Sequence, residues 1–169
     1  GAHGMSTFMS YYILSSVAMA GRTKDALQMM RDYYGGMLER GATTFWEDFD
    51  LSWLEGSGRI DEFPKKGQKD LHGDFGAYCY KGFRHSLCHG WSGGPVPFLM
   101  HYVLGIREAA AGCKKMLFAP DLCGLKWARG TYPVPQGNVE ISLTETRSGV
   151  KAEINAPAGI EIVRRKVRQ

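Results

Sequence analysis

A short acidic and aromatic stretch contains the first group in this sequence that could do chemistry. Residues 42–50 read ATTFWEDFD, where Glu47 follows Trp46 and the rings of Phe45 and Phe49 flank the pair. A buried strand disfavours the carboxylates, and a solvated loop does not favour the large rings. The mixture suits a cleft in which rings hold a ligand and a carboxylate exchanges protons. Glu47 is therefore the candidate catalytic residue, with a capping or salt-bridged glutamate as the alternative.

A second candidate group lies in the turn CHGWSGG, residues 88–94, which contains His89 and Trp91. Its glycines let the backbone approach a ligand closely. An indole ring can stack on the C–H face of a sugar while its N–H reaches a hydroxyl. We extend this expectation to Trp46 and Trp53, which also lie outside apolar stripes. Core packing is the alternative for each tryptophan, and a structural role is the alternative for the histidine.

Arg84 precedes this turn and could donate a forked pair of hydrogen bonds to a diol or to the carboxylate of Glu47. His85 and His89 are four residues apart, but no third ligand accompanies them, so we predict no metal site. The sequence has no phosphate-binding glycine loop and no dinucleotide fingerprint, and we expect no cofactor. The four cysteines lack metal-binding spacing, and we expect small buried side chains rather than a disulfide framework. They are Cys79, Cys88, Cys113 and Cys123.

The bulk composition is that of a globular chain. The 169 residues are 44% hydrophobic and 22% charged, which is enough apolar material for a core. The formal net charge is only +4, and part of it comes from the terminal run RRKVRQ. We therefore predict no nucleic-acid binding, and no apolar run is long enough to predict a membrane span. Residues 1–5, GAHGM, resemble an expression scar.

The predicted secondary structure changes from helical to extended along the chain. Apolar spacing predicts a helix over 6–20 and a second over 23–40, joined by a short GRT connection as a helical hairpin. Residues 50–84 predict a long ordered loop, and 96–104 a short helix. Alternating segments bounded by Gly, Pro and Asn follow, and they predict a sheet or sandwich. The expected fold class is α+β, with one unit over 6–108 and a β-sandwich over 109–169.

The order of several motifs resembles a known family. GATTFWEDFD follows the helical hairpin, then come SLCHGWSGGPVPFL, YVLGI, a strand ending FAP, and ARGTYPVPQGNVEIS. This order is similar to the C-terminal end of the α-L-rhamnosidases of glycoside hydrolase family 78, from about residue 11 to 162. The resemblance implies the last helices of an (α/α)6 barrel followed by a C-terminal antiparallel β-sandwich. It also implies a secreted or periplasmic parent protein.

The resemblance implies hydrolysis of terminal α-L-rhamnosyl residues with inversion. By motif position, Glu47 would be the general base and His89 would contact the sugar, with Trp46 and Trp91 as walls of the sugar site. The loop over 50–84 is longer than the family pattern, and the general acid would lie in a part of the barrel that this chain lacks. We therefore expect the chain to be inactive alone.

Two other readings remain open at this point. One is a non-catalytic carbohydrate-binding or scaffold module that uses Trp53 and Trp91 as a stacking platform. The other is a purely structural or interaction module. If barrel neighbours are missing, the aromatic face of the first helix and the face of the second helix should be open to water, and the chain should self-associate through its helical hairpin. The residues concerned on the second helix are Leu27, Met30, Tyr34 and Met37.

Overall fold

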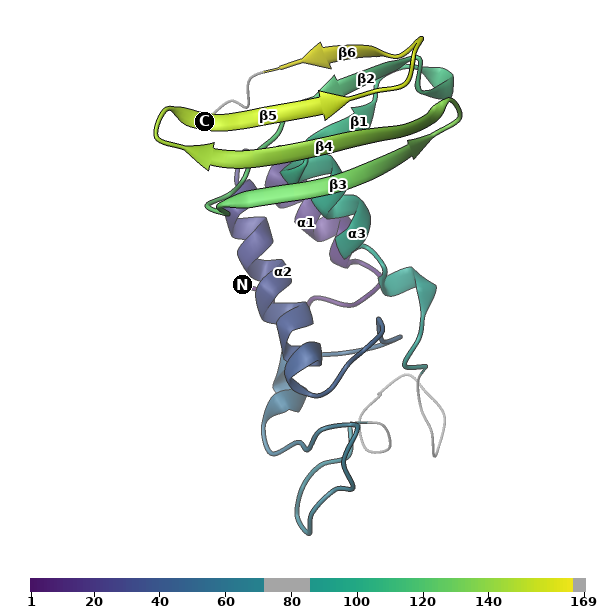
Figure 1. Ribbon diagram of the computed structural model, residues 1–169. Helices are drawn as coiled ribbons and strands as arrows, with labels where there is room; N and C mark the ends of the chain where they lie inside the picture. Colours follow the sequence, from purple (N-terminus) through teal and green to yellow (C-terminus); the bar gives the residue numbers. More distant parts are fainter. Residues whose placement is uncertain (72–85, 166–169) are drawn as a thin grey trace. The chain divides into compact units, whose positions relative to one another are not determined.

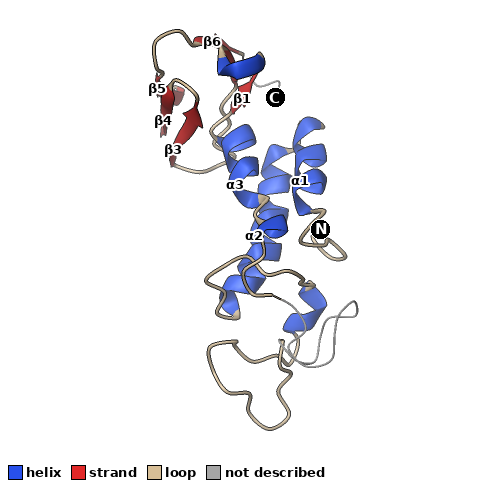
Figure 2. Ribbon diagram, turned by 90° about the vertical axis from the view of Figure 1, so that its right-hand side faces the viewer, coloured by secondary structure: helices blue, strands red, loops and turns tan. Residues whose placement is uncertain are grey.

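A computed structural model describes residues 1–71 and 86–165 of the chain (Figure 1). The chain divides into two compact units. Unit 1 comprises Gly1–Ser16 and Asp25–Pro95, and unit 2 comprises Val17–Lys24 and Val96–Gln169. Among the described residues, helices and loops make up the first part of the chain and the strands come after residue 105, as the change in sequence character predicts (Figure 2). The α+β class is confirmed.

The predicted helical hairpin is present as α1 (Ser10–Met19) and α2 (Thr23–Glu39). Helix α1 begins four residues later than predicted, because the residues before it form a turn that side-chain hydrogen bonds stabilise. The hydroxyl of Ser10 donates to the carbonyl of Thr7 at 2.7 Å. Helix α2 ends at Glu39, and Gly41 follows in the turn with a φ of +89°, a conformation that favours glycine.

The expectation of an open helical surface is met in part. The aromatic face of the first helix is open, with Tyr12 55% exposed, whereas the inner face of α2 is buried. Leu27, Tyr34 and Met37 are 3%, 8% and 2% exposed. The acidic and aromatic stretch folds back on this helix, with the ring of Phe45 edge-on to Tyr34 at 5.8 Å. Phe49 packs in the same way on the neighbouring tyrosine of α2, at 5.2 Å. These contacts bury a surface that barrel neighbours are not needed to cover.

The first part of the predicted long loop is ordered by polar contacts. It begins with a 3-10 turn, Leu51–Leu54, and continues irregularly to Leu71, with a bridge between Ser57 and Lys69. The guanidinium of Arg40 donates to the hydroxyl of Ser57 at 2.8 Å and to the carbonyl of Leu54 at 3.0 Å. The rest of this loop, 72–85, lies outside the described residues.

Unit 2 contains two three-stranded sheets, preceded by helix α3 (Pro95–Phe98) and a π-helical turn, Leu99–Val103. The first sheet has the order β1-β2-β6, and the second is the meander β3-β4-β5. Their bounds are β1 Ile106–Glu108, β2 Lys115–Phe118, β3 Trp127–Val134, β4 Gly137–Thr146, β5 Gly149–Asn155 and β6 Glu161–Arg164. The pairings are antiparallel as predicted for the sandwich, with one exception, because strand β6 runs parallel to β2.

The two sheets share one hydrophobic core. Alternation in β4 directs Val139, Ile141 and Leu143 inward, each no more than 3% exposed. The other sheet contributes Ile106, Met116 and Phe118, each no more than 1% exposed. Leu104 and Met100 join the same cluster from the helical turn. Unit 2 therefore combines this core with the preceding helical turn, and the domain boundary expected at residue 108 stays a prediction.

Gly105 marks the entry into this core. Its φ is +73°, and a Cβ on this residue would lie 2.3 Å from the carbonyl carbon of Ala119. The backbone of Ala119 donates to the Gly105 carbonyl at 2.8 Å, so the two segments approach closely. Only glycine satisfies both the conformation and the close approach.

Candidate functional site

The two motifs singled out in the sequence lie side by side in unit 1. The backbone N–H of Glu47 donates to the carbonyl of Ser86 at 2.8 Å, and that of His89 donates to the carbonyl of Phe45 at 2.8 Å. The hydroxyl of Thr44 also donates to the carbonyl of Leu87. These hydrogen bonds pair two segments that are about forty residues apart in the sequence, and they place the carboxylate against the histidine-bearing turn.

The Glu47 carboxylate is fixed by a hydrogen bond and is partly exposed to solvent. Its Oε2 accepts a hydrogen bond from the backbone N–H of Ser86 at 2.7 Å. Nδ1 of His89 lies 3.8 Å from the same oxygen, beyond direct hydrogen-bond range but close enough for a charge interaction or a bridging water. The side chains of Glu47 and His89 are 20% and 31% exposed. A carboxylate in this position can both keep its orientation and reach a water molecule.

The indole of Trp91 completes the group. Its N–H donates to the backbone carbonyl of Glu47 at 2.7 Å, and the hydroxyl of Thr7 donates to that same carbonyl. The ring is 49% exposed and lies 4.3 Å from the His89 imidazole, tilted by 46°. Because its N–H is directed to the backbone, the indole is fixed in place while part of its face stays open.

An aromatic surface that the sequence reasoning did not assign extends from Trp91. The ring of Phe8 lies 5.7 Å from Trp91 and 6.1 Å from Tyr12. Phe8 and Tyr12 are 48% and 55% exposed. Open aromatic faces beside a carboxylate and an imidazole suit a polyhydroxylated ligand, whose C–H faces stack and whose hydroxyls hydrogen-bond.

The remaining predicted site residues take other positions. Trp46 is 1% exposed, and its ring packs edge-on against Phe49 at 5.7 Å, so it supports the stretch from inside unit 1 and does not present an open wall. Trp53 is half-buried in the turn after it, 6.2 Å from Phe49. Arg84 lies outside the described residues, as does His85. The functional roles of Trp46, Trp53 and Arg84 stay predictions.

Sequence reasoning missed Ser86, Thr7 and Phe8. Ser86 contributes through its backbone N–H, which no side-chain pattern reveals. Thr7 and Phe8 precede the first helix and reach the site only because the chain folds back. No local pattern indicates that residues 45–47 pair with residues 86–89. The family resemblance of the motif order was the only sequence signal for this pairing.

Two features, a metal-binding cluster and a membrane-spanning helix, are absent from the described residues. No group of three or more His, Cys, Asp or Glu side chains among residues 1–71 and 86–165 could hold a metal ion. Within the same residues, no helix has the length and apolar character that crossing a bilayer requires.

Cys113 and Cys123 are buried free thiols, as expected, whereas Cys88 is exposed, because it lies in the open turn beside Ser86. Cys79 lies outside the described residues.

Comparison with known proteins gives a consistent result. Residues 105–163 match a family described as the bacterial alpha-L-rhamnosidase C-terminal domain. A curated alpha-L-rhamnosidase of Alteromonas sp. (strain LOR) is 25% identical over 168 residues, covering 94% of this chain. That alignment covers 16% of the relative, so the chain spans about a sixth of its length.

Solved structures extend the similarity to the fold of nearly the whole chain. A family 78 rhamnosidase of Bacillus sp. GL1 is 30% identical with a TM-score of 0.72, over 95% of this chain and 15% of that protein. An alpha-L-rhamnosidase from Dictyoglumus thermophilum has a TM-score of 0.65 at 23% identity, over 90% of this chain and 15% of its own. A Streptomyces avermitilis enzyme, solved with L-rhamnose, has a TM-score of 0.63 at 18% identity, covering 90% and 13%.

Proposed function

We propose that this chain is the C-terminal part of an α-L-rhamnosidase of glycoside hydrolase family 78, which it resembles in sequence and fold, and that Glu47 is the general base of the complete enzyme. The complete protein would hydrolyse terminal α-L-rhamnosyl residues with inversion. One observation carries this proposal. The Glu47 carboxylate is oriented by the Ser86 N–H at 2.7 Å, remains 20% exposed, and faces the turn bearing His89 and Trp91.

In the proposed step, Glu47 accepts a proton from a water molecule while the water oxygen bonds to the anomeric carbon. The bond between that carbon and the leaving oxygen breaks on the opposite face, and a general acid protonates the leaving oxygen. The Ser86 N–H orients the Glu47 carboxylate for this step by donating a hydrogen bond to its Oε2.

The neighbouring side chains have separate proposed roles. His89 would donate or accept a hydrogen bond with a sugar hydroxyl, since its imidazole is partly open beside the carboxylate. Trp91 would stack on the sugar, because its exposed ring is locked by the bond to the Glu47 carbonyl. Arg84 and Trp53 remain proposed sugar-binding residues, and Trp46 would act by supporting the carboxylate-bearing stretch from the interior.

We further propose that the general acid lies in sequence outside this chain. An inverting pair has its carboxyl groups about 6.5–9.5 Å apart across the bond that breaks. Helices α1 and α2 would belong to the end of an (α/α)6 barrel that contributes this second carboxyl group, in a secreted or periplasmic protein. The isolated 169-residue chain would then show no turnover.

The test uses the complete protein and the change Glu47→Gln. Turnover of an aryl α-L-rhamnoside should fall by at least about a thousandfold, because the amide cannot take the proton from water. Glu55→Gln is the matched control, because Glu55 is exposed in the same unit, and it should leave the rate unchanged. A near-normal rate for Glu47→Gln would refute the assignment. The anomeric form of the first product, followed by NMR, tests inversion.

A non-catalytic carbohydrate-binding role is the second candidate function. The exposed rings of Phe8, Tyr12 and Trp91 favour it, because they form a stacking surface that needs no general acid. This role predicts that the isolated chain binds L-rhamnose in calorimetry and that Trp91→Ala weakens the binding. Full retention of activity by Glu47→Gln together with such binding would favour this candidate over the first.

A further inference from the structure

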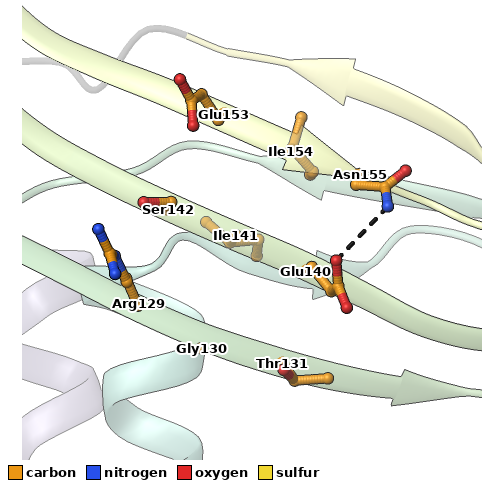
Figure 3. Close-up of a pocket in the computed structure, with 9 residues that line it drawn as sticks. All are labelled: Arg129, Gly130, Thr131, Glu140, Ile141, Ser142, Glu153, Ile154 and Asn155. Carbon is orange, nitrogen blue, oxygen red and sulfur yellow. Dashed lines mark hydrogen bonds between the residues drawn. The ribbon is translucent and has the colours of Figure 1, made fainter.

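The outer face of the β3-β4-β5 sheet carries a polar depression that lies entirely within unit 2. It has a volume of about 490 Å³ (Figure 3). The strand register places side chains in rows across the sheet, with Arg129 opposite Ser142 and Ser142 opposite Glu153. The next row contains Thr131, Glu140 and Asn155 in the same way.

The shape of the depression follows from the sizes of these side chains. Ser142 is short and lies in the central strand, between the long side chains of Arg129 and Glu153 on the two outer strands (Figure 3). The second row closes one end, where the amide of Asn155 donates to the carboxylate of Glu140 at 3.5 Å. A short residue flanked by long polar ones leaves a trough with donors and acceptors on its walls.

An exposed tryptophan lies in the row of the sheet next to Arg129, outside the residues that line the trough. Trp127 is 64% exposed and precedes Arg129 by two residues on β3, so both side chains point to the outer face, about 7 Å apart along the strand. The register places Thr144 and Lys151 beside it. Burying this ring would be favourable, but the surface around it is polar, which suits a ligand with both an apolar face and hydroxyl groups.

The charge of the surface selects among ligands. Two cationic side chains, Arg129 and Lys151, are balanced by the carboxylates of Glu140 and Glu153, and Lys151 pairs with Glu153 at 2.7 Å. A phosphate, a nucleic acid or an acidic peptide would require an excess of positive charge. A balanced set of hydrogen-bonding groups beside an open indole is instead typical of recognition of neutral polyhydroxylated molecules.

From these observations we propose that the outer face of β3-β4-β5 binds a neutral saccharide, with Trp127 stacking on the sugar ring. Arg129 and Ser142 donate hydrogen bonds to sugar hydroxyls, and Glu153 accepts them. This site is separate from the Glu47 turn and performs no chemistry. It would hold a carbohydrate chain near the protein while another part of the molecule acts. Only the choice of rhamnose as probe rests on the proposed function.

The test titrates methyl α-L-rhamnopyranoside and a neutral rhamnose-containing oligosaccharide into the 15N-labelled 169-residue chain. We expect shifts in the amide signals of β3, β4 and β5 with a Kd on the order of 1 mM for the monosaccharide, because a single sugar buries little surface. Trp127→Ala should weaken binding by about tenfold or more, because the stacking surface is lost. Ser142→Tyr should abolish it by filling the trough floor.

The control is Val150→Ala. Val150 lies on the same sheet, but alternation along β5 directs its side chain to the face opposite Glu153, so this variant should bind normally. Circular dichroism of each variant checks the fold. The absence of shifts on these strands with either sugar would overturn the proposal, as would unchanged binding by a folded Trp127→Ala variant. Equal shifts with inorganic phosphate would also overturn it, by indicating an anion site.

The two proposals fail in different ways. Shifts confined to residues near Glu47 and Trp91 would overturn the sheet-face site and leave the catalytic assignment standing. Shifts on the sheet face together with full activity of the Glu47→Gln enzyme would support the sheet-face site and overturn the catalytic assignment.

Discussion

The two units of the chain hold their structures by different means. In unit 1, side-chain hydroxyl and indole groups bind backbone carbonyls far away in the sequence, as in the bonds from Thr7 and Trp91 to the Glu47 carbonyl. In unit 2, strand ladders satisfy the backbone, and side chains such as Ile141 and Phe118 fill a common core. Unit 1 can therefore present a carboxylate on an irregular turn, while unit 2 offers a regular surface.

The two ways of holding the backbone favour different kinds of site. An irregular turn can aim a backbone N–H at a carboxylate, which regular pairing within a sheet rarely allows, since sheet amides are used by neighbouring strands. A sheet instead repeats its side chains in rows, which gives a broad surface with graded polarity. The Glu47 turn and the outer face of β3-β5 correspond to these two cases.

The largest effect on stability should come from the core of unit 2. Phe118→Ala removes a ring that is 1% exposed and should lower the free energy of unfolding by about 3–5 kcal/mol. Phe63→Ala makes the same chemical change at a ring that is 98% exposed in unit 1, and it should change stability by less than about 0.5 kcal/mol. Urea unfolding followed by circular dichroism measures both, and equal losses would mean that the core does not hold unit 2 together.

A smaller effect is expected from one hydrogen bond of unit 1. The hydroxyl of Tyr33 is buried and donates to the carbonyl of Phe49, and burial raises the pKa of this phenol well above its usual range. Tyr33→Phe leaves that buried carbonyl without its donor and should cost about 1–3 kcal/mol. Tyr12→Phe, at a ring that is 55% exposed, is the control and should be near neutral. A neutral Tyr33→Phe would show that such bonds do not stabilise the irregular unit.

The smallest expected effect is a pH dependence in unit 2. Burial, together with the charge of Arg107, lowers the pKa of His101 below its ordinary value of 6.5. The unfolded chain then binds the proton more readily, so this residue makes the free energy of unfolding fall as pH drops from 7 towards 5. His101→Gln should reduce that loss, measured as the difference in thermal midpoint between pH 7 and pH 5. An identical loss in the variant would exclude His101 as the source.

Local sequence signals predicted much of the fold. Alternation in NVEISLTET placed Val139, Ile141 and Leu143 inside, and helical spacing with a glycine stop gave α2 its bounds. The parallel pairing of β6 with β2 was not predicted, because a strand's own pattern does not state its partner. The candidate residues Glu47, His89 and Trp91 came from residue type and motif order, whereas Trp46 was assigned to an open wall and is buried.

Spacing along the chain is enough to indicate which segments are helical or extended, and residue type is enough to indicate which side chains are polar enough for chemistry. Tertiary structure alone decided that the Ser86 N–H meets the Glu47 carboxylate and that Phe8 meets Trp91. It also decided that Arg129, Ser142 and Glu153 share one row. These contacts join residues distant in sequence, and their closeness follows from the packing of the whole chain, which no local pattern encodes.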